Sequence, residues 1–187
     1  MDESYQAFVD DPTPERFLAA RRAVIDDPGY PPDGLPLVKL ERLLDAAQFT
    51  RLARETARLL HAWRLSPRMH FLAGVAAAEL GRTARASEQR RQLQACLQGL
   101  LGTGDGTRER PFLVTHASDE YDVVRALGHQ PITQQLVDSG SRRMDVIGCR
   151  GGIELWFDVT ALLGAAPAAV QVTARRSRRR NPVARLS

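Results

Sequence analysis

A histidine and two acidic residues stand close together at positions 116–120, a combination suited to acid–base chemistry. His116 titrates near neutrality, and a carboxylate of Asp119 or Glu120 could orient its ring for proton transfer. The two acids also fit the first turn of a helix over residues 119–128, capped by Ser118, where the helix dipole favours negative charge. The sequence has no serine or cysteine in a nucleophile-elbow motif. We therefore expect these acids to serve the helix start rather than catalysis.

The segment before them holds three glycines around one aspartate, and its backbone N–H groups could face an anion. A phosphate loop, however, lies between a strand and a helix and carries a lysine, whereas here a helix precedes the loop and a strand follows it. A calcium loop needs more acids than Asp105 and Glu109. We expect a joint in which Gly102, in the left-handed conformation, ends a helix and Asp105 fixes a turn. If the loop binds a ligand instead, the candidate residues are Gly102, Gly104, Asp105, Gly106, His116 and Glu120.

Histidines and cysteines give no pattern typical of a metal site. Cys96 and Cys149 lie far apart in the sequence, and His61, His70 and His129 are scattered. We expect no metal and no cofactor, and we expect both cysteines to be reduced thiols packed as small apolar side chains.

The positive charge of the chain belongs to its C-terminal end. The sequence has 26 basic and 22 acidic residues, and the segment 175–187 holds six arginines and no acid, so the rest has 20 against 22. We expect a solvated, disordered tail, because a block of like charges cannot build a core. Weak contact with nucleic acid or an anionic membrane is the alternative role. The tail residues that would carry it are Arg175, Arg176, Arg178, Arg179 and Arg180.

Apolar residues at helical spacing dominate residues 1–101. Thr13 and Pro14 open a first helix, and four further amphipathic segments cover residues 36–47, 49–64, 68–80 and 84–100. Their short connections predict antiparallel neighbours. The separation of Leu52 and Ala86 equals the period of a tetratricopeptide repeat, and residues 79–86 resemble the joint of such a repeat, with Gly81 at the turn.

Residues 102–164 change to an alternating pattern. We expect strands at 111–115 and 132–137, the helix at 119–128, and a hairpin of residues 142–149 and 153–160 that turns at Gly151-Gly152. The fold class is therefore α+β, in which antiparallel helical hairpins over 1–101 precede a small antiparallel sheet with one helix. Residues 165–187 form the arginine-rich tail.

Several short segments, in this order and spacing, resemble a bacterial family of domains of unknown function with a helical N-terminal half and a Ser/Thr-Gly-Asp-Gly joint. The matching pieces lie within residues 14–160 and are 30–32, 103–107, 119–128, 134–137, Asp145 and 156–159. The resemblance implies no established activity. Many members of the family look exported, whereas this sequence begins with an acidic segment that does not resemble a signal peptide.

Taken together, these patterns predict a non-catalytic, cytoplasmic module that binds another protein through its helical pairs. The first alternative is a small-ligand binder or hydrolase with a cleft at the Gly-Asp-Gly joint. The second alternative is polyanion association through the tail.

Overall fold

The computed structural model of the chain describes residues 3–31 and 35–163, and the predictions for the arginine-rich tail lie outside these residues. The fold is α+β, with helices first and a four-stranded sheet last. The helices are α1 (Glu3–Asp10), α2 (Pro14–Ile25), α3 (Leu35–Asp45), α4 (Phe49–Leu59), α5 (Pro67–Glu79), α6 (Thr83–Leu101) and α7 (Ser118–Ala126). The strands are β1 (Phe112–Leu113), β2 (Pro131–Ser139), β3 (Arg142–Cys149) and β4 (Ile153–Asp158).

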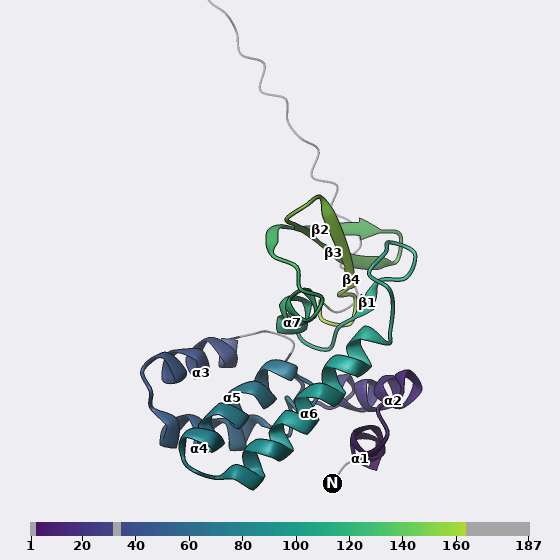
Figure 1. Cartoon of the computed structure of the whole chain (residues 1–187). Helices are drawn as coiled ribbons and strands as arrows, with labels where there is room; N and C mark the ends of the chain where they lie inside the picture. Colours follow the sequence, from purple (N-terminus) through teal and green to yellow (C-terminus); the bar gives the residue numbers. More distant parts are fainter. Residues whose placement is uncertain (1–2, 32–34, 164–187) are drawn as a thin grey trace, which may run out of the picture.

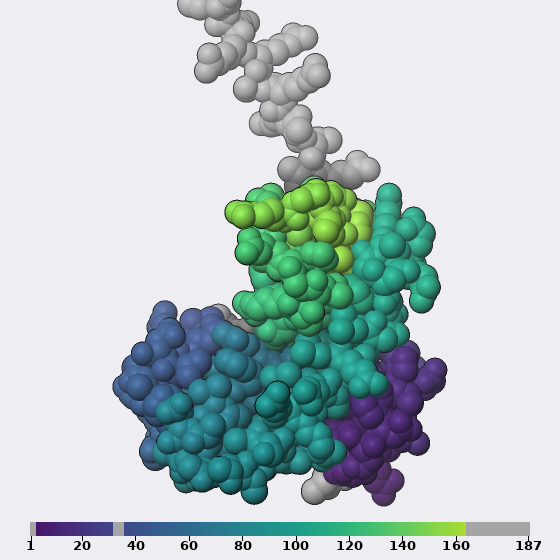
Figure 2. All heavy atoms as spheres, viewed as in Figure 1, coloured from purple at the N-terminus to yellow at the C-terminus, as the bar shows by residue number. Residues whose placement is uncertain are grey.

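Helix α6 is the central element (Figure 1). It packs against α1 and α2 on one side, against α5 on another and against α7 near its end. In the space-filling view the sheet, in green, stands above the helical half, with α3 and α4 to the left and α1 and α2 to the right (Figure 2).

Two clusters of buried side chains form the core. One joins α2, α6, α7 and the sheet, and it includes Phe17, Cys96, Phe157 and Cys149. The second lies among α3, α4 and α5 around Leu40, Leu52 and Leu72. No helix in the described part of the chain is long and apolar enough to cross a membrane.

The turns before α4 and α6 have the same geometry. Ala47 and Gly81 both have positive φ, of 52° and 69°. The following residues, Gln48 and Arg82, have φ/ψ of −83°/57° and −88°/66°. Each donates its backbone N–H to the carbonyl five positions before it, Leu43 at 2.9 Å and Ala77 at 2.8 Å. Gly81 therefore occupies the turn that the sequence predicts, and Ala47 is its counterpart in the preceding pair.

The sheet has the strand order β1-β4-β3-β2, so β2 is an edge strand. Antiparallel pairing joins β2 to β3 and β3 to β4, and Gly151 and Gly152 form the turn of the second hairpin as predicted. The sheet is mostly antiparallel, as predicted, and the short strand β1 adds one parallel pairing, with β4. Leu155, Phe157 and Val159 are buried on the face turned toward α6 and α7.

Three local predictions are wrong, and one helix was not predicted. The acidic segment 3–10 forms a helix that the sequence analysis missed, since Phe8 and Val9 bury its apolar side. The helix expected at 49–64 ends at Leu59. Gly102 has φ −74° and not the left-handed conformation. Ser118 begins α7 without capping it.

Candidate functional site

The Gly-Asp-Gly loop is a turn that satisfies its own polar groups. The Asp105 carboxylate accepts hydrogen bonds from the backbone N–H of Thr107 at 3.0 Å and from the Thr107 hydroxyl at 2.7 Å. These bonds lower the pKa of Asp105. The backbone N–H groups of Asp105 and Gly106, which an anion would need, both donate to the carbonyl of Arg110. The loop therefore has the local structure of a joint.

Close packing explains the three glycines of this loop. A side chain at Gly104 would collide with the backbone carbonyls of Arg110 and Pro111, and one at Gly102 would lie 2.9 Å from Pro14 Cγ. Gly106 has φ +78° and lies against the ring of Phe112. The carbonyl of Gly106 accepts a 2.9 Å bond from the backbone of Trp156 in β4. The loop thus ties the end of α6 to the sheet.

His116 lies in the interior, stacked on Trp63. The two rings are 4.2 Å apart with an interplanar angle of 15°, and the Tyr30 ring lies 5.7 Å away. The side chain has no exposed surface, and burial lowers the pKa of His116 to about 3, although the Ala62 carbonyl beside it acts in the opposite direction. His116 is therefore a neutral ring at physiological pH, sealed from any substrate.

The Asp119 side chain binds the backbone of the two residues Thr115 and His116, which lie before α7. Its Oδ2 accepts bonds from the backbone N–H groups of Thr115, at 2.9 Å, and His116, at 2.8 Å, and lies 4.0 Å from the His116 ring nitrogen. Burial raises the pKa of Asp119 to about 8. The predicted pair of His116 and Asp119 therefore exists, but both groups are uncharged at neutral pH. Asp119 and Glu120 lie in the first turn of α7, as the sequence predicts.

Residues from α2 and from the segment that follows it complete this buried centre. Arg21 in α2 donates two hydrogen bonds to the carbonyl of Val114, at 2.7 and 3.1 Å. The hydroxyl of Tyr30 donates to the carbonyl of Thr115. These bonds, with the stacking of His116 on Trp63, hold the segment between β1 and α7 against the helical half. The role of these contacts is therefore structural: they join the helical half to the sheet half.

Glu120 belongs to a separate polar cluster between α7 and the sheet. The side-chain amide of Gln134 donates to Glu120 at 3.1 Å and to Asp145 at 2.7 Å. The Tyr121 hydroxyl donates to the amide oxygen of Gln134 at 2.6 Å. Burial, and then the neighbouring Asp145, raise the pKa of Glu120 to about 9. Asp105, His116 and Glu120 are therefore found in three separate polar networks, and not in one cleft.

The sequence analysis did not propose Gln134 and Asp145 as site residues. Both lie in the segments that carried the family resemblance, at 134–137 and at Asp145. That signal, taken together with Glu120 and Tyr121 in the segment 119–128, would have identified this cluster.

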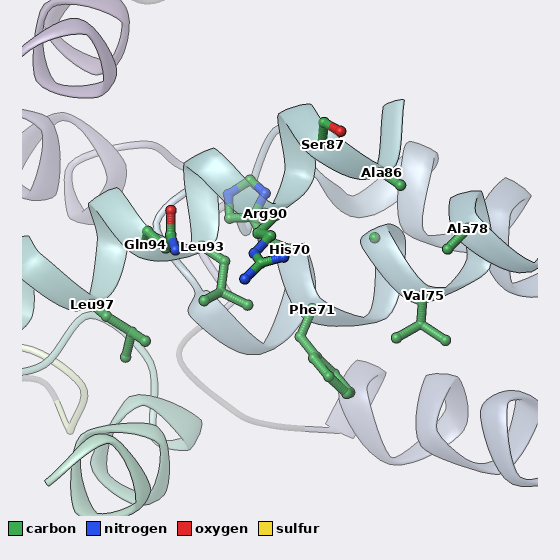
Figure 3. Close-up of a pocket in the computed structure, with 11 residues that line it drawn as sticks. His70, Phe71, Val75, Ala78, Ala86, Ser87, Arg90, Leu93, Gln94 and Leu97 are labelled. Atoms are coloured by element: carbon green, nitrogen blue, oxygen red, sulfur yellow. The ribbon is translucent and has the colours of Figure 1, made fainter. Parts of the chain in front are cut away.

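A groove with a volume of about 670 Å³ runs along α5 and α6 (Figure 3). Further hollows of about 430 and 370 Å³ continue from it. The first two share Phe71, Leu93 and Leu97, and the last two share Arg68, Asp122 and Arg125. The path leads from the turn between α5 and α6 to the space between α3 and α7. We name the first two hollows the α5–α6 groove; they are lined by Pro67, Arg68, His70, Phe71, Gly74, Val75, Ala78, Ala86, Ser87, Arg90, Leu93, Gln94, Leu97, Asp122, Arg125 and Ala126.

The walls of the α5–α6 groove combine apolar side chains with one unpaired charge. Phe71 is 39% exposed, and the guanidinium of Arg68 lies 5.0 Å above its ring. Arg68 pairs with Glu41 at 2.7 Å, and Arg125 pairs with Asp122 at 3.0 Å. Arg90 has no carboxylate within ion-pair distance in the described part of the chain. The groove thus presents apolar surface and a free guanidinium to solvent.

His70 lines this groove, and both nitrogens of its buried ring are in hydrogen-bond contact. One ring nitrogen lies 2.9 Å from the amide oxygen of Gln89 and the other lies 2.7 Å from the carbonyl of Arg64. The contact with Gln89 continues through Gln92 to Glu88. Burial lowers the pKa of His70, while both hydrogen bonds act in the opposite direction. His70 therefore fixes α5 against α6 and the segment before α5.

Comparison with known proteins gives a match to a family. The model of a family described as a domain of unknown function (DUF4919) matches residues 42–166. No curated protein and no solved structure matches the chain. The match includes His116, Glu120, Gln134 and Asp145 and all residues that line the α5–α6 groove, whereas the segment 30–32 of the expected resemblance lies outside it.

Proposed function

This chain belongs to the DUF4919 family of domains of unknown function, and we propose that it is a non-catalytic module that binds another protein in the α5–α6 groove. The observation that carries the proposal is the apolar, solvent-open wall of this groove, formed by Phe71, Val75, Leu93 and Leu97. A continuous apolar hollow of this kind, rimmed by polar residues, is typical of interaction sites.

The repeated turn geometry supports the same function. The separation of the turns at Ala47 and Gly81 equals the period of tetratricopeptide repeats. Arrays of such helix pairs bind peptides and helices on their grooved surfaces. We therefore propose that α3–α4 and α5–α6 are two tetratricopeptide-like units, with α2 and the sheet half covering the ends of the stack.

The geometry gives less support to the alternative of a hydrolase or ligand binder at the joint. A general acid or base must reach the atom it protonates or deprotonates. His116 and Glu120 are buried, and the groove and the hollow that continues from it are not lined by Asp105, His116 or Glu120. The predicted cytoplasmic location is part of our proposal, and the binding partner would be a protein of that compartment.

Affinity capture with matched variants tests this function. The full chain and the variant Phe71→Glu serve as bait in extract from the native cell, and Ile132→Glu is the control, since Ile132 is 67% exposed on the edge strand β2, outside the groove. We expect a protein recovered by the wild type and by Ile132→Glu to be lost from Phe71→Glu, with thermal transitions of all three within a few degrees. Equal recovery by all three baits would contradict the proposal.

A further inference from the structure

We propose that the α5–α6 groove takes an amphipathic α-helix of another protein, with a carboxylate of that helix bound to Arg90. This inference rests on the proposed function and adds the conformation and the charge of the partner segment. Three features of the groove carry it: the spacing of its walls, the absence of free backbone groups along these described helices, and the guanidinium of Arg90.

The wall residues recur at helical spacing on both helices. Phe71, Val75 and Ala78 follow one another at intervals of four and three residues along α5, and Ala86, Arg90, Leu93 and Leu97 do so along α6 (Figure 3). Each helix thus presents one straight row of side chains to the groove. The row from residue 86 to residue 97 is about 16 Å long at a rise of ~1.5 Å per residue. A partner helix of about three turns matches this length.

The chemistry of the walls favours a helix over an extended peptide. An extended segment must pair its backbone N–H and C=O groups with its neighbours. The walls are two α-helices, and their backbone groups bond within the helices. The polar side chains that line the main hollow are Ser87, Arg90 and Gln94, together with the ring of His70, which is already hydrogen-bonded. A helix satisfies its own backbone, so it can bury apolar side chains here without leaving polar groups unpaired.

Arg90 sets the charge of the partner. Arg68 and Arg125 are paired with acids of this chain, so among the described residues Arg90 is the guanidinium of the groove that lacks a carboxylate partner. A carboxylate at the edge of an apolar contact would form a charge-assisted hydrogen bond with it. The chain's own C-terminal segment does not fit this requirement, because residues 175–187 include six arginines and no acid.

The shape of the groove also predicts which end of the partner helix carries its large apolar side chains. Phe71, Leu93 and Leu97 are shared with the adjoining hollow, so the widest apolar surface lies toward α7. Large apolar side chains of the partner would fill that end, whereas the small residues Gly74, Ala78 and Ala86 at the other end allow a close approach of the partner's backbone.

Peptide display provides the test. A random library of 16-residue peptides on phage is selected on the full-length chain, with counter-selection on Phe71→Glu. We expect enriched peptides to carry apolar residues at i, i+3 or i+4, and i+7 together with an acid. A synthetic copy is then expected to gain helical circular dichroism on binding. By fluorescence anisotropy, Arg90→Glu should weaken it at least tenfold, and a Glu→Lys version of the peptide should recover binding to Arg90→Glu.

The outcomes separate the two levels of the proposal. Some peptides could bind the wild type but not Phe71→Glu and yet lack helical spacing, lack an acid or bind Arg90→Glu equally well. Such peptides would overturn the helix inference and leave the proposed function standing. Absence of any peptide that distinguishes the wild type from Phe71→Glu would overturn both. A dimer of the chain in light scattering that Phe71→Glu dissociates would assign the groove to a second copy and overturn the inference.

Discussion

Replacing Ala47 by glycine is expected to stabilise the protein, and replacing Gly81 by alanine is expected to destabilise it by a similar amount. Both residues occupy the same position of the equivalent turns before α4 and α6, and both have positive φ. A side chain at Gly81 would meet no other atom within 4 Å. The pair of substitutions therefore isolates backbone conformation from packing, with each variant serving as the control for the other.

The magnitude follows from two opposing effects. Holding a non-glycine residue in the left-handed region costs roughly 1–2 kcal/mol. Glycine in turn loses more conformational freedom on folding, by roughly 0.5–1 kcal/mol. The difference predicts a gain of about 0.5–1 kcal/mol in the free energy of unfolding for Ala47→Gly, and a loss of about the same size for Gly81→Ala. A change of about 1 kcal/mol corresponds to roughly 2–4 °C in Tm for a chain of this size.

Urea unfolding followed by far-ultraviolet circular dichroism measures both changes. We expect the two midpoints to move in opposite directions with an unchanged m-value. If Ala47→Gly destabilised the protein, Ala47 would owe its conformation to packing of its methyl group, and the equivalence of the two turns would be refuted. An unchanged midpoint for Gly81→Ala would refute it as well.

Four further predictions concern the joint, the buried acids and the tail. Burial raises the pKa of Asp119 and Glu120 to about 8 and 9, so the folded chain keeps protons that the unfolded chain has released, and Tm should fall from pH 7.5 to pH 9. Burial lowers the pKa of His116 to about 3, so Tm should also fall as the pH drops below 4.5, because only the unfolded chain protonates His116 there. A Tm that rises from pH 7.5 to pH 9 would contradict this assignment. Asp105→Ala should lower the midpoint of urea unfolding slightly, because the hydrogen bonds from Thr107 are lost. Unchanged stability with loss of partner binding would make the loop a binding site. A fragment of residues 1–101 should lack a sharp thermal transition, because it loses the sheet half that covers Phe17 and Cys96; a transition equal to that of the full chain would show two independent units. Deletion of residues 175–187 should leave Tm unchanged and reduce salt-dependent retention on heparin, since it removes six arginines; a large fall in Tm would show that these residues contribute to the fold.

Local patterns predicted the helices and the hairpin well, because these elements depend on nearby residues. Helical spacing placed α3, α5 and α6 within a few residues of their observed ends, and Gly151-Gly152 placed the β3–β4 turn. Long-range pairing could not be predicted in this way. β1 has two residues, and its parallel partner β4 lies far along the chain, so that Phe112 pairs with Phe157.

The candidate site shows the same limit. The close spacing of His116 and Asp119 predicted their proximity, and the structure confirms it. Their burial could not be predicted, because it depends on Trp63 and Tyr30, which come from distant segments. For the same reason the sequence suggested a left-handed Gly102, whereas contact with Pro14 of α2 explains the glycine. The α5–α6 groove follows from the packing of two helices and gives no local motif.

Site-specific photo-crosslinking measures most directly whether the α5–α6 groove binds a protein. A photoreactive amino acid replaces Val75, inside the groove, or Ile132, on the edge strand, and the native cells are irradiated. Our account predicts a discrete protein adduct from position 75 that disappears when Phe71→Glu is added, and no such adduct from position 132. The same adduct from both positions, or an adduct from position 75 that persists with Phe71→Glu, would contradict it.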